Sequence, residues 1–165
     1  MVGKRWIAVC VVLAAAGASA LLLSGGEKKR IEKRLTQLAG TVSKERGDTA
    51  LNVALRVQRL PEFFDKPVRL HTQVYHMGGT LSPTEVASEI MRARAMFNTL
   101  KLDFYDVDID VADRTSARLR LTARVTGRLS TSEAIDEVRE LECLLRKVDG
   151  EWVFSECRAV AVLEK

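Results

Sequence analysis

The sequence has few of the residues that mark the common binding and catalytic classes of protein. Only 5% of its 165 residues are aromatic, and it contains two histidines and three cysteines. A nucleic-acid-binding surface usually combines a clustered basic face with aromatic side chains, whereas basic and acidic residues alternate along this chain. Two histidines without a nearby cysteine or carboxylate cluster do not make a zinc site. The sequence therefore predicts no nucleic-acid partner, no metal and no cofactor.

Acidic residues are missing from the N-terminus, where the first is Glu27. Residues 6–26 form an uncharged, largely apolar run, and about 20 helical residues cover the roughly 30 Å of a bilayer's hydrocarbon layer. We therefore predict a transmembrane anchor or uncleaved signal over residues 1–26. A cleaved signal peptide is the alternative, because the small residues 18–20 resemble a cleavage site.

The orientation of this anchor is set by conflicting charges. Lys and Arg are more numerous just after the run, in EKKRIEKR, than before it, which favours a cytoplasmic C-terminal domain. A very short basic N-terminus before an apolar run is instead typical of a signal anchor that exports the domain on its C-terminal side. We expect a single-pass membrane protein whose soluble domain is extracytoplasmic (periplasmic).

Residues 27–47 predict a basic amphipathic helix with one narrow apolar stripe. The apolar positions succeed one another at spacings of four, three and four; they are Ile31, Leu35, Leu38 and Val42. This helix is either a stalk continuous with the anchor or the first packed helix of the next domain. Gly47 ends it, and we assign residues 48–165 to one α+β domain.

Within residues 48–165, helical patterns come first and strand patterns come second. A helix is expected over residues 48–60, a strand over 67–75, and a further helix after Ser82-Pro83-Thr84-Glu85, which has the pattern of a capping box. After residue 101 the apolar residues recur at every second position, as in β-strands. Residues 132–148 could begin helically, but their second half is expected to form a hairpin across Asp149-Gly150.

Two neighbouring segments carry alternating aspartates and arginines. Leu102 and Phe104 have the opposite parity to Tyr105 and Val107, which predicts a β-bulge near Phe104. Beyond it, oppositely charged residues are expected to face each other across two strands on one solvated face, and these residues are Asp106, Asp108, Asp110, Arg118, Arg120 and Arg124. A calcium site is disfavoured, because aspartates along a strand diverge by roughly 6.6 to 7 Å per residue pair.

The order of these elements resembles the nuclear transport factor two-like superfamily, which includes SnoaL and ketosteroid isomerase. The resemblance covers residues 48–165 and is carried by GTLSPTEVASEIMRARAMF, LKLDFYDVDIDV, SARLRLTARV and LECLLRKVDGEWVFSECRAVAV. It implies a cone-shaped, cystatin-like roll in which helices pack on a curved antiparallel sheet, often around a pocket. Tyr75, Phe97 and Tyr105 are candidates for lining that pocket.

The superfamily contains both enzymes and members without chemistry. Enzymes of this kind place an aspartate or histidine base in the cone, and the weak candidates here are Asp103 and His71. We therefore expect a membrane-anchored, non-catalytic binding or scaffolding domain that docks a protein partner or holds a small apolar ligand. The alternatives are an isomerase- or lyase-like enzyme with a small apolar substrate in the cone, and a structural subunit of an envelope or secretion assembly.

Two of the three cysteines lie in the last predicted hairpin. If the turn centres on Gly150, Cys143 and Cys157 stand opposite each other, and the pair is compatible with a disulfide. The alternative is two buried thiols in neighbouring strands.

Overall fold

The computed structural model of the protein describes residues 25–45, 47, 50–71 and 79–160. Within these ranges no helix is long and apolar enough to cross a membrane, because each described helix is short or carries charged residues along one face. This finding contradicts the predicted single-pass membrane protein. The apolar run over residues 6–24, on which the predicted anchor rested, lies outside the described residues.

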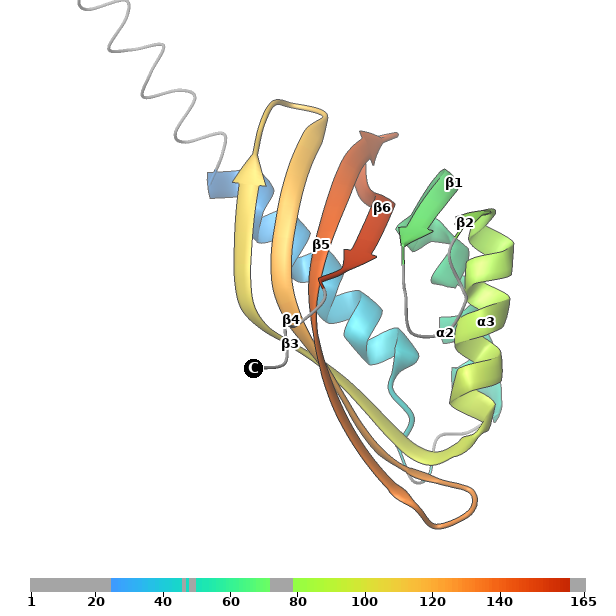
Figure 1. Ribbon diagram of the computed structural model, residues 1–165. Helices are drawn as coiled ribbons and strands as arrows, with labels where there is room; N and C mark the ends of the chain where they lie inside the picture. The colour runs from blue at the N-terminus through green and yellow to red at the C-terminus, as the bar shows by residue number, and fades with distance from the viewer. Residues whose placement is uncertain (1–24, 46, 48–49, 72–78, 161–165) are drawn as a thin grey trace, which may run out of the picture.

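One curved six-stranded sheet organises the domain, with the strand order β2-β1-β6-β5-β4-β3. The strands are β1 Phe64–His71, β2 Gly79–Leu81, β3 Phe97–Val111, β4 Ser116–Leu129, β5 Ala134–Val148 and β6 Glu151–Ala159. The helices are a helix over residues 25–42, which we call the N-terminal helix, α2 Ala50–Gln58, the short 3-10 helix η1 Leu60–Phe63 and α3 Pro83–Ala95. The long strands β3 to β5 curl beside the N-terminal helix. α3 lies next to β1 and β2, on the opposite side of the domain from the C-terminal end of β3 (Figure 1).

The sheet is mixed rather than antiparallel throughout. β1 runs parallel to β6, whereas all other neighbouring pairs are antiparallel. The expected fold class, α+β, is confirmed, and the expectation of a purely antiparallel sheet is wrong. The reason is that the chain crosses from β1 through β2, α3 and three long strands before β6 pairs with β1.

The N-terminal helix belongs to the hydrophobic core. Ile31 is fully buried, and with Leu35 and Leu38 it packs in the same cluster as Leu145 and Trp152. Burying one such aliphatic side chain contributes about 1.5–3 kcal/mol. Of the two alternatives for this helix, a stalk or the first packed helix, the second describes the structure.

Polar contacts fix both ends of the N-terminal helix. At its start, Glu27 accepts hydrogen bonds from Lys147 at 2.8 and 2.9 Å and from the Trp152 indole at 2.7 Å. These bonds, the one from Lys147 foremost, lower the pKa of the Glu27 carboxyl. At its end, Arg94 of α3, 4% exposed, donates to the carbonyls of Val42 and Ser43 at 3.2 and 3.1 Å. A cation at a helix C-terminus also interacts favourably with the helix dipole.

The predicted bulge in the Asp-rich strand is present. The register of β3 against β4 shifts between Tyr105 and Asp108, and Asp106 has a φ of 50°. Because of this shift, Phe104 and Ile109 both pack against the core. Tyr105 precedes the shift and points the other way, with 46% of its surface exposed. Its expected inward orientation is therefore wrong.

The helix start at Ser82 is confirmed as a capping box. The Ser82 hydroxyl accepts from the Glu85 amide at 3.3 Å, and the Ser82 amide donates to the Glu85 carboxylate at 2.7 Å. The helical beginning considered for residues 132–148 is wrong, since these residues are strand from residue 134 onward. There the extended pairing with β4 along the whole strand outweighs the local helical signal.

Candidate functional site

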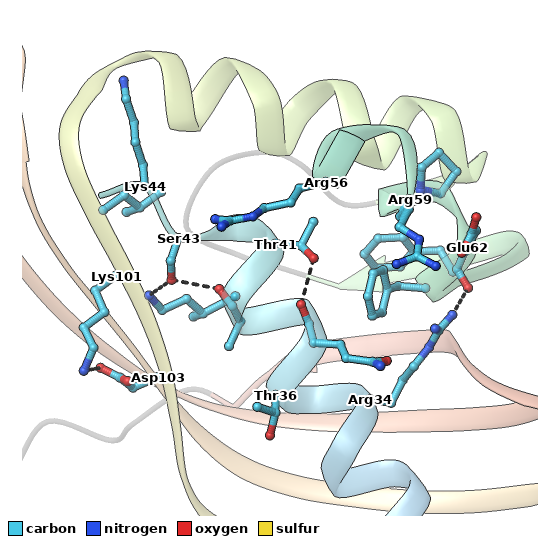
Figure 2. Close-up of a pocket in the computed structure, with 18 of the residues that line it drawn as sticks. Arg34, Thr36, Thr41, Ser43, Lys44, Arg56, Arg59, Glu62, Lys101 and Asp103 are labelled. Carbon is cyan, nitrogen blue, oxygen red and sulfur yellow. Dashed lines mark hydrogen bonds and ion pairs between the residues drawn. The ribbon is translucent and has the colours of Figure 1, made fainter. Parts of the chain in front are cut away.

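An open cleft of about 1470 Å³ lies between the N-terminal helix, the α2–η1 segment and the first half of β3. Its apolar lining includes Phe63, Phe64, Leu100 and Val153. Charged and hydroxyl side chains line the rest, and Figure 2 shows them projecting from the helices and from β3. A cleft with apolar walls and a few polar groups is the usual form of a small-molecule site.

Arg34 forms part of the cleft wall and is committed to the fold. It donates to the carbonyls of Trp152, at 3.2 Å, and Glu62, and it stacks on the Phe63 ring at 4.1 Å from the ring centroid. Its side chain is 12% exposed and lies 3.9 Å from the Glu151 carboxylate. Burial, the largest influence, lowers the pKa of its guanidinium.

Arg56 and Arg59 bring two exposed guanidinium groups to the same cleft. Arg56 lies in the last turn of α2, and Arg59 is the residue that precedes η1. In Figure 2 the Arg59 guanidinium is turned toward Arg34, while Arg56 extends across the cleft toward Ser43. Arg59 and Arg34 are close enough that the charge of Arg59 contributes to lowering the pKa of Arg34. Like charges therefore face each other at this end of the cleft.

Most hydroxyl groups near the cleft are used by the local backbone. Thr41 donates to the carbonyl of Gln37 at 2.8 Å. Ser43 donates to Ala39 at 2.8 Å and accepts from the Leu102 amide at 3.1 Å, so it joins the end of the N-terminal helix to β3. These groups shape the cleft and are not arranged as nucleophiles.

The carboxylates that line the cleft differ in their partners. Asp103 pairs with Lys101 and Glu151 with Arg34, and Asp149 sits in the β5–β6 turn. Glu62 is exposed and makes no side-chain hydrogen bond with the described residues, and its charge is close enough to Arg34 to act on the pKa of that guanidinium, raising it against the larger effect of burial. Glu62 lies three residues after Arg59, and residues three apart eclipse in a 3-10 turn. The two side chains therefore share the face of η1 that borders the cleft.

Of the two residues expected to act as a base, Asp103 lines the cleft and His71 does not. The Asp103 carboxylate lies 2.8 Å from the ammonium group of Lys101, and this contact raises the pKa of Lys101. Lys101 and Asp103 both line the cleft at its β3 side. His71 lies at the end of β1, 54% exposed and 3.5 Å from Glu156. Their assignment as catalytic residues stays a prediction.

The expected pocket-lining residues lie elsewhere. Phe97 and Tyr105 are not among the residues that line the cleft, and Tyr75 falls in residues 72–78, outside the described ranges. Among the residues that do line it, Arg56 and Arg59 lie at the end of the helix expected over residues 48–60, and Glu62 follows that helix. The stop signal at Pro61 was the available hint, because it forces a turn at this position.

The charged face of the sheet lies away from the cleft. Asp108 faces Arg120 and Asp110 faces Arg118, in the expected register. The close ion pairs are nevertheless different, since Arg120 lies 3.6 Å from Glu142 and the guanidinium of Arg124 forms two bonds of 2.8 and 2.6 Å with Asp136. Asp106 contacts Thr122 at 3.3 Å. All six residues assigned to this face are exposed.

The two hairpin cysteines are opposite each other in register, and both are free thiols in the structure. Cys143 is buried, and the pKa of the Cys157 thiol is raised by its hydrogen bond with Cys143 and by burial. The disulfide stays a prediction.

Comparison with known proteins identifies the fold and no close relative. No family model and no curated protein matches the chain. A scytalone dehydratase-like protein from Novosphingobium aromaticivorans matches with a TM-score of 0.68 and 15% identity, over 86% of this chain and 87% of that one. LinA matches with a TM-score of 0.67 and 13% identity, over 84% and 88%. The hexachlorocyclohexane dehydrochlorinase LinA-type3 from Novosphingobium barchaimii matches with a TM-score of 0.65 and 11% identity, over 84% and 88%.

These neighbours contradict the expectation of a non-catalytic scaffold and fit the lyase-like alternative better. The described helices and strands also leave an open cleft lined by charged groups, which the lyase-like alternative requires. The membrane and envelope expectations gain no support from the same comparison. The chain thus shares the fold of these solved structures, and that fold is of the kind that its resemblance to the nuclear transport factor two-like superfamily implied.

Proposed function

We propose that the protein is a lyase that eliminates a small leaving group from an organic molecule bound in the cleft. The observation that carries this proposal is the open cleft of about 1470 Å³ between the N-terminal helix, η1 and β3. The fold supports it, because the neighbours named as a dehydratase-like protein and a dehydrochlorinase share this architecture over more than four fifths of the chain.

Dehydration and dehydrochlorination are both eliminations. The bonds that break and form in an elimination determine which groups the site needs. A base removes a proton from one carbon, the electrons of the C–H bond form a C=C bond, and the leaving group departs from the adjacent carbon with its bonding pair. Chloride leaves as the anion, whereas hydroxide must gain a proton and leave as water. The site therefore needs one unpaired base and a group that stabilises developing negative charge.

Glu62 is the residue that we assign as the base. A general base must be free to accept a proton, and the exposed Glu62 carboxylate makes no hydrogen bond within the described ranges, while the Arg34 charge lies near it. The Asp103 and Glu151 carboxylates are held by Lys101 and Arg34. Arg59, on the same face of η1, supplies the positive charge next to it.

The test is a turnover assay of the full-length chain with β-hydroxy and β-chloro ketones, whose α-protons are acidic, and with hexachlorocyclohexane. Formation of the conjugated product is monitored by ultraviolet absorbance, and chloride release is monitored separately. We expect catalysed elimination with at least one compound and a loss of about 100-fold or more in kcat for Glu62→Gln, because positioned acid-base groups contribute roughly 10²–10⁴-fold.

A matched control is Glu89→Gln, because Glu89 is a glutamate of α3 paired with Arg92 and not part of the cleft. The Glu89→Gln variant should turn over the substrate at the wild-type rate. Absence of turnover across the whole panel, or a fully active Glu62→Gln variant, would count against the assignment.

A further inference from the structure

The charges around η1 are unevenly balanced. The basic side chains at this end of the cleft, Arg34, Arg56, Arg59 and Lys66, outnumber the acidic ones, Glu62, Asp149 and Glu151. Arg34 is held by two backbone carbonyls and lies near Glu151. The Arg59 side chain is exposed, and among the residues that the structure describes it has no hydrogen-bonding or ion-pairing partner.

Apolar surface adjoins this excess charge. Phe63 is buried beneath the Arg34 guanidinium, and Phe64 stacks at a tilt on Phe154 with ring centroids 6.1 Å apart. Phe63 and Phe64 line the cleft beside Arg59. A ligand that satisfies both features needs an anionic group and an aromatic or aliphatic body close to it.

We infer that the cleft binds a small organic acid whose carboxylate is held by Arg59 and whose apolar body lies against Phe64, beside the buried Phe63. A guanidinium group offers two parallel N–H donors that match the planar carboxylate. This inference rests on the proposed function in identifying the ligand as a substrate. Binding itself can be measured without turnover.

A carboxylate suits this cleft better than a phosphate does. Phosphate sites usually use the N–H groups and positive dipole at a helix N-terminus. The part of the N-terminal helix that lines the cleft near Arg56 is its C-terminal end, at Thr41 and Ser43 (Figure 2). That end carries a partial negative charge, which penalises a dianion more than a monoanion.

The experiment is isothermal titration of the full-length chain with naphthoate, naphthamide and naphthyl phosphate. These probes share one aromatic body and differ in charge. We expect naphthoate to bind about tenfold or more tightly than the neutral naphthamide, because a charge-assisted hydrogen bond is worth roughly a tenfold difference or more. Naphthyl phosphate should bind no more tightly than naphthoate.

Two variants locate the site. Arg59→Gln should reduce naphthoate affinity about tenfold or more and leave naphthamide unchanged, whereas Arg118→Gln, an exposed arginine on the outer face of the sheet, should bind both as the wild type does. Thermal unfolding of both variants checks that they are folded.

Several results would overturn the inference: equal binding of naphthoate and naphthamide, unchanged naphthoate affinity in Arg59→Gln, or preferred binding of naphthyl phosphate. If naphthoate binds through Arg59 but no elimination is found with any compound, the proposed lyase activity fails and the carboxylate site stands. If elimination occurs but naphthoate binds no more tightly than naphthamide, the carboxylate site fails and the proposed lyase activity stands.

Discussion

Arg94 and Arg59 come from neighbouring helical segments on the same side of the sheet, yet their surroundings differ. Arg94 is 4% exposed and donates to two carbonyls at the end of the N-terminal helix. Arg59 is exposed at the rim of the cleft, near Arg34 and three residues before the exposed Glu62. The difference shows that the acceptors around an arginine decide its role. An arginine with buried carbonyl acceptors stabilises the fold, whereas an exposed one can bind a ligand.

The largest effect is expected from removing the buried arginine. Arg94→Leu would leave the Val42 and Ser43 carbonyls buried without donors, which should lower the free energy of unfolding by about 3 kcal/mol. Urea denaturation measures this change. Arg92→Leu is the matched control on the same helix, because Arg92 is exposed and pairs with Glu89 on the surface, and it should stay within about 0.5 kcal/mol of the wild type. If both substitutions lowered the free energy of unfolding by the same amount, Arg94 would not have the special role in the fold that we assign to it.

A smaller loss is expected at the other end of the same helix. Glu27→Gln replaces a carboxylate that accepts from Lys147 and the Trp152 indole, and it leaves the partly buried ammonium group without its counter-ion. We expect a loss of about 2 kcal/mol in the free energy of unfolding. Lys147→Met in the Glu27→Gln background should add little, since the two changes remove one interaction. A full additive loss would show that the pair is not coupled.

The pH dependence of stability should report the same contact. The pKa of Glu27 is lowered from its ordinary value of 4.5, chiefly by the bond from Lys147. A carboxyl with a lowered folded-state pKa contributes stability that is present above the unfolded-state pKa and lost as the pH falls through the folded-state value. The wild type should therefore lose its advantage over Glu27→Gln as the pH falls from about 5 toward 3. A constant difference between the two proteins over this range would contradict the account.

The smallest effect on stability is expected in the cleft. Arg59→Gln removes an exposed side chain that no described residue binds, so the free energy of unfolding should change by less than about 0.5 kcal/mol. Thermal unfolding measured alongside Arg94→Leu gives the comparison directly. A loss as large as that of Arg94→Leu would mean that Arg59 supports the fold.

Local sequence signals predicted several elements because their physics is local. The capping box at Ser82 and Glu85 needs only four residues. The bulge brings Phe104 and Ile109, which have opposite parity, into one core, and the opposite parities of the apolar residues in this strand were the local signal for it. The hairpin at Asp149 and Gly150 likewise depends on two residues, both with positive φ.

The remaining features depend on contacts between distant segments. Pattern alone placed Tyr105 inward, although the register changes only after it. Nothing in the helix that contains Arg94 marks it as buried, because its acceptors lie about fifty residues earlier in the chain. The cleft was missed for the same reason: Arg56, Arg59 and Glu62 are ordinary surface residues until η1 is placed against the N-terminal helix.

The measurement that tests the central claim most directly is a naphthoate titration of the isotope-labelled full-length chain, monitored residue by residue by nuclear magnetic resonance. The account predicts chemical-shift changes that saturate together at Arg59, Phe63 and Phe64, with the charged face around Arg118 unaffected. Shift changes confined to that charged face, or no saturable change at η1, would contradict the assignment of this cleft as the functional site.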